Sequence, residues 1–220
     1  MSSTESTPRS FPLAHHFHAP QQQIESAKLG MWLFLATEIL LFGGLFCAYA
    51  IYRSLHPEVF YNAHHYLDVK WGALNTIVLL FSSLTVALSI RAAQTNQQGL
   101  MKGYLVATLA CAMVFLVVKY IEYSHKFHVG LLPGGHFTAA GEHIPNPDQL
   151  HIFFGIYFLM TGLHGIHVVI GMIVLGWVLV RSMKGEFGPH YYTPLELGGL
   201  YWHLVDLIWI FLFPLLYLIS

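Results

Sequence analysis

The sequence has 220 residues, of which 55% are hydrophobic and only 10% are charged. Soluble globular chains carry roughly 25% charged residues, so this composition excludes an ordinary soluble domain and indicates a membrane protein. The formal net charge of −1 provides no basic surface for nucleic acid, while histidine, with 15 residues, outnumbers the 10 lysines and arginines.

Five apolar runs are long enough to cross a bilayer as helices, which takes roughly 20 apolar residues each. The runs are continuous and lack the alternation of a membrane β-barrel. The sequence therefore predicts an all-α integral membrane bundle, with a polar N-terminal segment over residues 1–27 and a five-helix membrane domain over residues 28–220. The helices are expected at about residues 28–53, 70–92, 100–124, 149–181 and 195–219.

The distribution of basic residues predicts a cytoplasmic N-terminus and a periplasmic C-terminus. In this orientation the cytoplasmic side carries Arg9, Lys28, Arg91, Lys102, Arg181 and Lys184. The other side carries Arg53, Lys70, Lys119 and Lys126. Cytoplasmic loops are enriched in Lys and Arg, which favours this arrangement. The longest connection, residues 125–149, would then face the periplasm.

The acidic side chains of Glu38 and Glu122 lie within the first and third predicted helices, where ionisable groups are costly and commonly functional. Glu38 lies near the middle of the first helix. It is either a proton-relay or lipid-facing carboxyl, or a neutral acid bonded across a helix interface. Glu122 lies near the outer end of the third helix, and Lys119 three residues earlier shares its face. A local ion pair is expected there.

The last two predicted helices carry a cluster of histidines and one aspartate. His164 and His167 are three residues apart on one helix face, and so are His203 and Asp206 on the next helix. The spacing predicts a polar network that joins the two helices. A haem or metal site built on the same residues is the alternative, since a catalytic metal needs three converging ligands.

Several segments resemble subunit III of the cytochrome c oxidase family, in the family's order and over residues 18–219. The two most specific are Thr161-Gly162-Leu163-His164-Gly165-Ile166-His167-Val168 and Tyr201-Trp202-His203-Leu204-Val205-Asp206-Leu207-Ile208-Trp209. The others are Lys28-Leu29-Gly30-Met31-Trp32-Leu33-Phe34 leading to Glu38, Asn75-Thr76 followed by Leu79-Leu80 and Ser82-Ser83, and Glu122-Tyr123.

The resemblance implies an accessory subunit of a proton-pumping haem–copper oxidase in a bacterial inner membrane. In this family subunits I and II hold the haems and copper and reduce oxygen with electrons from cytochrome c. Subunit III binds beside subunit I, carries no redox cofactor or catalytic residue, and sustains proton uptake and enzyme lifetime. The resemblance therefore favours the polar network over a metal for His164, His167, His203 and Asp206, with Glu122 as a further structural polar residue.

The resemblance also implies sites for a structural phospholipid. Arg181 matches an arginine that holds a lipid phosphate, Glu38 matches the family's intramembrane carboxyl near a lipid cleft, and His18 matches a headgroup-contacting histidine. The chain has five predicted helices where the family's usual form has seven, so half of that cleft would be missing unless another subunit supplies it. The long connection over residues 125–149 is expected to contact subunit II, a cytochrome c domain or a partner respiratory complex, as in a supercomplex.

Two other functions remain open from the sequence. The chain is alternatively the homologous subunit of a quinol oxidase, because quinol-oxidising relatives carry such a subunit. The second alternative is a membrane cytochrome with its own haem on His164, His167 or His203. A small transporter that uses Glu38 as a coupling carboxyl is less consistent with the sequence, which shows no internal repeats.

Overall fold

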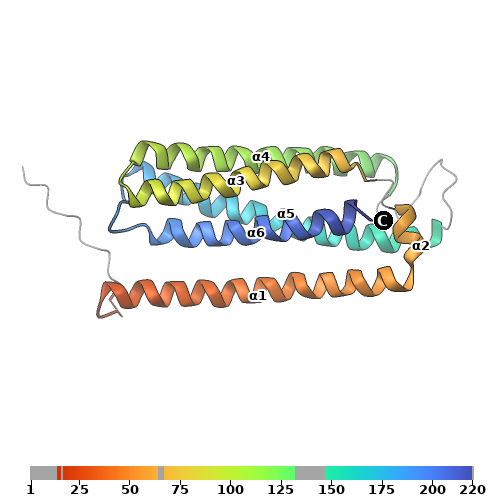
Figure 1. Ribbon diagram of the computed structural model, residues 1–220, viewed down its shortest axis with the longest axis horizontal. Coiled ribbons are helices and arrows are strands. Elements are labelled where there is room, and N and C mark those ends of the chain that lie inside the picture. The colour runs from red at the N-terminus through yellow and green to blue at the C-terminus, as the bar shows by residue number, and fades with distance from the viewer. Residues whose placement is uncertain (1–13, 16, 64–66, 132–146, 220) are drawn as a thin grey trace, which may run out of the picture.

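A computed structural model describes residues 14–15, 17–63, 67–131 and 147–219. The protein is an elongated helical bundle (Figure 1). Among the described residues, five helices are long and apolar enough to cross a membrane, which confirms the predicted bundle of five spans. The helices are α1 (Pro20–Leu55), α2 (Pro57–Ala63), α3 (Val69–Gln94), α4 (Gln98–His128), α5 (Pro147–Met183) and α6 (Thr193–Tyr217).

Two helical segments differ from the sequence-based boundaries. α1 begins at Pro20 rather than at residue 28, because proline is well suited to the first helical turn and because Gln21 donates to Glu25 one turn later, at 2.8 Å. The short helix α2 has no counterpart among the predicted elements. Both segments are too polar or too short to stand out in an apolar-run search.

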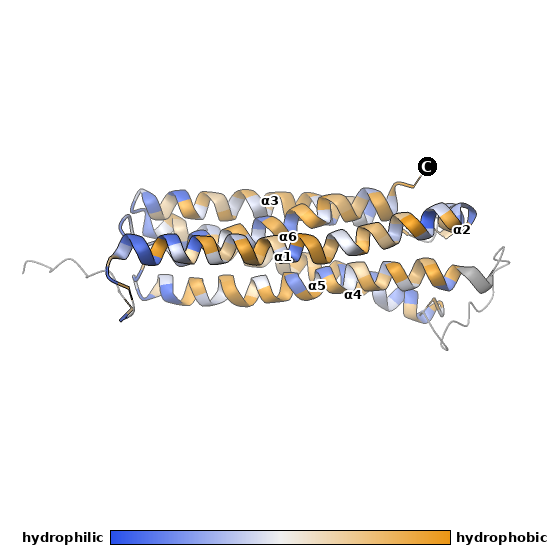
Figure 2. Cartoon of the chain, turned by 90° about the horizontal axis from the view of Figure 1, so that it is seen from below, coloured by the Kyte–Doolittle hydropathy of each residue, from blue (hydrophilic) through white to orange (hydrophobic). Residues whose placement is uncertain are grey.

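Hydrophobic residues dominate the middle of the long helices, and hydrophilic residues gather towards their ends (Figure 2). α1 has 36 residues, which at ~1.5 Å per residue is longer than the ~30 Å hydrocarbon layer. Its ends therefore extend into the interfacial regions. We call the end of the bundle that carries α2 and the C-terminus the C-terminal end, and the opposite end the N-terminal end.

The helices α3, α4, α5 and α6 form a packed body, and α1 runs along one side of it (Figure 1). A tight turn at Asn96, whose φ of 59° lies in the left-handed region that Asn tolerates, makes α3 and α4 antiparallel neighbours. The largest fully buried side chains of this body include Trp202 and Trp209 on α6 and Phe153 and Phe154 on α5.

The helix α1 touches this body along a single stripe. Its buried residues are Leu35, Phe42 and Tyr49, which are spaced seven residues apart and therefore lie on one face. Most of its other large apolar side chains are exposed, as Leu40 is at 75%. In a membrane this surface faces lipid or another subunit.

Candidate functional site

The intramembrane carboxyl of Glu38 on α1 is paired with His167 on α5. His167 Nε2 lies 2.8 Å from Glu38 Oε2, and both side chains are largely shielded, with 11% and 14% of their surface exposed. Phe42, one turn further along α1, places its ring edge-on to the imidazole at 5.2 Å between centroids. The pair therefore lies at the seam between α1 and the four-helix body.

The hydrogen bond of the second ring nitrogen of His167 determines which ring nitrogen carries the hydrogen. Nδ1 is 2.8 Å from the carbonyl oxygen of Leu163, and because a carbonyl only accepts, Nδ1 carries the hydrogen and donates. Nε2 then either donates to an ionised Glu38 as part of an imidazolium or accepts a hydrogen bond from a protonated Glu38. The pair thus holds one proton in either of two places.

A second ionic cluster is built around Glu122 on α4, near the C-terminal end of the bundle. Glu122 Oε1 accepts hydrogen bonds from Lys126 at 2.8 Å, Tyr157 at 2.8 Å and Tyr217 at 2.6 Å. Glu122 Oε2 accepts from Lys119 at 2.9 Å. The expected pair with Lys119 is present, but it is part of a larger network that joins α4, α5 and α6.

The Glu122 cluster is deeply buried and carries an uneven charge. The side chains of Lys119, Glu122 and Lys126 expose only 9%, 6% and 4% of their surface. Two ammonium groups face one carboxylate, and Lys119 also lies 4.6 Å from the ring centre of Trp209, whose π-face helps to offset a buried cation. The sequence signal for Lys126 was its position four residues after Glu122 on the same face.

The polar residues His203 and Asp206 of α6 face serines on α3. His203 Nδ1 lies 2.6 Å from Ser83 Oγ, while Ser82 Oγ lies 3.4 Å from Asp206 Oδ2 and accepts from Trp202 Nε1 at 3.0 Å. These contacts tie α3 to α6 in the membrane interior. Because α3 contributes Ser82 and Ser83 from more than 100 positions away, no spacing rule within one helix could have paired them.

His164 is fully buried between aromatic rings. Its ring centre lies 5.6 Å from that of Phe115 and 5.1 Å from that of Trp209. Neither of its ring nitrogens has a hydrogen-bond partner among the described residues. The site packs the imidazole like a small aromatic side chain.

The predicted network of His164, His167, His203 and Asp206 between the last two helices is therefore wrong. The residues are distributed over three separate environments: His167 with Glu38, His164 among aromatic rings, and His203 and Asp206 with α3 serines. Spacing of three residues places side chains on one helix face, but it does not decide which neighbouring helix that face meets. Among the described residues, no group of three or more His, Cys, Asp and Glu side chains is arranged to hold a metal ion.

The two predicted headgroup-contacting residues lie towards the N-terminal end of the bundle. Arg181 Nε donates to Glu186 at 2.6 Å, and its guanidinium lies 4.7 Å from the ring centre of Trp177. His18 is exposed just before α1, and its backbone N–H donates to the Gln22 side chain at 3.2 Å. The connection over residues 125–149 was predicted to contact a partner. Its segment 132–146 lies outside the described residues.

Comparison with known proteins identifies the family. Residues 13–220 match the family described as cytochrome c oxidase subunit III. Cytochrome c oxidase subunit 3 of Thermostichus vulcanus is 31% identical over 87% of each chain. A probable quinol oxidase subunit 3 of Staphylococcus haemolyticus is 27% identical over 88% of this chain and 89% of its own length.

A longer relative carries a second subunit in the same polypeptide. The haem–copper oxidase subunit I+III of Aeropyrum pernix is 29% identical over 93% of this chain, which spans only 24% of that protein. The family match over nearly the whole length, together with the multi-pass helical bundle, leads to one conclusion. The chain belongs to the cytochrome c oxidase subunit III family.

Proposed function

We propose that this chain is the cofactor-free accessory subunit of a proton-pumping haem–copper terminal oxidase in a bacterial inner membrane. In this proposal subunits I and II hold the haems and copper, accept electrons from cytochrome c and reduce oxygen to water. This chain supplies no catalytic residue. It binds beside subunit I, supports proton uptake and prolongs the life of the active enzyme.

The observation that carries the proposal is the Glu38–His167 pair. It is a carboxyl and an imidazole at membrane depth, 2.8 Å apart, and the carboxyl is on α1, the span with the smallest buried share among the described residues. Such a pair exchanges one proton between two sites with little movement of either side chain. A subunit that assists proton uptake needs a group of this kind near its boundary with the catalytic partner.

The exposed surface of α1 is the proposed contact with subunit I. Leu29, Leu33 and Leu40 each expose more than 60% of their surface, and an apolar surface alone does not distinguish lipid from protein in a membrane. The Aeropyrum protein, whose name combines subunits I and III, supports a partner of the subunit I type.

Glu38→Gln in the purified oxidase tests the proton-linked function. We expect the optical spectrum and haem content to stay unchanged, because the haems lie in the partner subunits, while steady-state proton uptake slows and turnover ends earlier. Glu25→Gln is the matched control, since Glu25 is an exposed carboxylate on the same helix. Haem loss in Glu38→Gln, or proton uptake and lifetime equal to the control, would contradict the proposal.

The electron donor is the point on which the relatives divide. Relatives named cytochrome c oxidase subunit 3 and quinol oxidase subunit 3 match this chain over similar lengths, so a quinol oxidase is the second candidate. Oxygen consumption by the purified complex with reduced cytochrome c, and separately with a quinol, decides between them. Oxygen consumption with the quinol but not with reduced cytochrome c would show that the electron donor is a quinol.

The packing of the histidines supports a subunit without its own haem. Rings of Phe115 and Trp209 flank His164, His167 uses both nitrogens for Leu163 and Glu38, and His203 Nδ1 is bonded to Ser83. A haem on His164 would have to displace the flanking rings, and a haem on His167 would have to displace Glu38 or the Leu163 carbonyl. The isolated chain is therefore expected to give no Soret band.

Two further parts of the proposal concern lipid and partner contacts. Arg181 and His18 lie at the end of the bundle where they would bind a structural phospholipid, and Arg181 would exchange its Glu186 partner for the lipid phosphate. The connection over residues 125–149 would contact subunit II, a cytochrome c domain or a partner respiratory complex. Deletion of residues 130–146 should weaken that association, and unchanged co-purification and donor affinity would refute it.

A further inference from the structure

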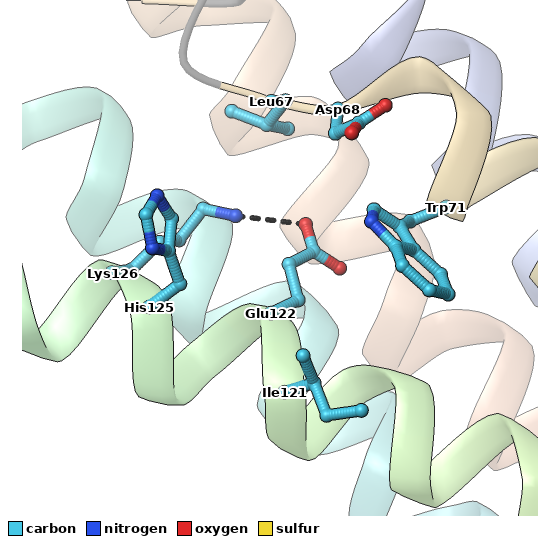
Figure 3. A pocket seen from close by; sticks show the side chains of 7 residues that line it. All are labelled: Leu67, Asp68, Trp71, Ile121, Glu122, His125 and Lys126. Atoms are coloured by element: carbon cyan, nitrogen blue, oxygen red, sulfur yellow. Dashed lines mark hydrogen bonds and ion pairs between the residues drawn. The ribbon is translucent and has the colours of Figure 1, made fainter.

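A pocket of about 540 Å³ opens at the C-terminal end of the bundle, between the start of α3 and the end of α4 (Figure 3). Its volume lies within the roughly 300–1,000 Å³ typical of small-ligand sites. It lies at the opposite end of the bundle from Arg181, and it shares no residue with the Glu38–His167 pair. It adjoins the buried Glu122 cluster, with which it shares Glu122 and Lys126, and adds Asp68, Trp71 and His125 to its walls.

The pocket has charges of both signs on its walls. Lys126 is 97% buried, with 3% of its surface exposed, and its Nζ lies 2.8 Å from Glu122 Oε1. Asp68 caps α3, with Oδ1 accepting from the Lys70 backbone N–H at 2.9 Å. Figure 3 shows Lys126 and His125 on one side of the pocket and Asp68 and Trp71 on the other.

The charges are close to balance. Lys126 lines the pocket together with the carboxylates of Glu122 and Asp68, and Lys119 lies behind Glu122 at 2.9 Å. A simple anion would meet the Asp68 carboxylate, and a simple cation would meet the Lys126 ammonium. A ligand with separated positive and negative groups fits both walls.

Apolar residues connect the pocket to the lipid-facing surface. Trp71 is 42% exposed and Ile121 is 51% exposed, and both line the pocket. They lie at the first turn of α3 and near the last turns of α4, where tryptophan is typical of the membrane interface. A ligand in the pocket therefore has a path for acyl chains along the outside of the bundle.

We propose that this pocket binds the headgroup of a zwitterionic phospholipid. The phosphate lies on the side of Lys126 and His125, where an ammonium and an imidazole donate to its oxygens. The lipid ammonium lies on the side of Asp68 and Trp71, between a carboxylate and an aromatic face that attracts cations. This site does not depend on the proposed oxidase function, since it uses only residues of this chain.

Lipid retention by the purified chain tests the proposal. The full chain, delipidated in detergent, is incubated with equal amounts of dioleoyl phosphatidylethanolamine and dioleoyl phosphatidylglycerol, and native mass spectrometry counts the bound lipids. We expect phosphatidylethanolamine to be preferred. Asp68→Asn, which keeps a side chain that caps helices well, should lower the ratio of the two lipids about fivefold, as loss of a partly solvated ion pair predicts.

Two more variants make the test specific. Glu58→Gln is the matched control, because Glu58 is an exposed carboxylate in α2 at the same end of the bundle, and it should leave the lipid ratio unchanged. Trp71→Leu keeps an apolar residue but removes the aromatic face, so it should also reduce the preference for phosphatidylethanolamine.

Three results would overturn the proposal. One is a preference of the unaltered chain for phosphatidylglycerol, and another is a ratio unchanged by both Asp68→Asn and Trp71→Leu. The third is complete displacement of the lipid by soluble phosphoethanolamine, which would assign the pocket to a water-soluble zwitterion instead.

Discussion

The buried cluster around Glu122 makes a strong prediction about stability. In Glu122→Leu the carboxylate that accepts from Lys119, Lys126, Tyr157 and Tyr217 is lost. Two ammonium groups, whose side chains are at most 9% exposed, then remain without their counter-charge. Removing one partner of a buried ion pair costs about 3–5 kcal/mol, so the equilibrium constant for folding should fall by a factor of roughly 150 to 5,000.

The expected change is large enough to measure on the purified chain. Unfolding in mixed micelles of a mild detergent and dodecyl sulfate, followed by circular dichroism, gives the free energy of unfolding. For a chain of this size ~1 kcal/mol corresponds to a Tm change of about 2–4 °C, so thermal unfolding should shift downward by about 6–20 °C. Glu196→Gln is the control.

The control separates burial from charge. Glu196 pairs with Lys28 at 3.0 Å, but these side chains are 29% and 41% exposed, and such a pair contributes about 0–1 kcal/mol. A triple variant that also replaces Lys119 and Lys126 by Met should recover much of the lost stability, because an apolar replacement of a whole buried network is often neutral. If Glu122→Leu costs no more than Glu196→Gln, the reasoning is refuted.

Two further predictions concern helix contacts. A Cβ at Gly171 would lie 2.7 Å from Trp202 Cε3, so Gly171→Ala should cost about 1–3 kcal/mol of unfolding free energy. Gly165→Ala is its control, because nothing lies within 4 Å of a Cβ built there. Equal losses of stability in the two variants would contradict the packing argument. Tyr49→Phe removes the hydroxyl that donates to the Leu215 carbonyl, and chemical unfolding should report a loss of about 0.5–1.5 kcal/mol. No loss in Tyr49→Phe would mean that this contact adds nothing to the docking of α1.

The sequence predicted the parts of the fold that depend on local properties. Long apolar runs identify spans whatever their partners are, because each span must satisfy its own backbone in lipid, and all five are present. The Lys119–Glu122 pair was also predictable, since both residues lie on one turn of one helix. The start of α1 was not, because its first turns are stabilised by polar contacts.

The contacts between helices could not be predicted from the same patterns. Glu38 and His167 are separated by 129 residues, and nothing in the spacing of His164 and His167 shows that only one of them faces α1. Tyr217 joins the Glu122 cluster from 95 residues away. Such pairings depend on how the helices rotate and pack, which one sequence does not specify.

The single contact stripe of α1 has a consequence for its dynamics. Its buried residues are only Leu35, Phe42 and Tyr49, whereas α6 buries residues over most of its length. An element with few buried contacts opens at a lower free energy than the rest of a protein. α1 is thus expected to be the first helix to undock from the body, while its own backbone hydrogen bonds persist in the lipid. A neighbouring subunit that covers the exposed face of α1 would hold it in place.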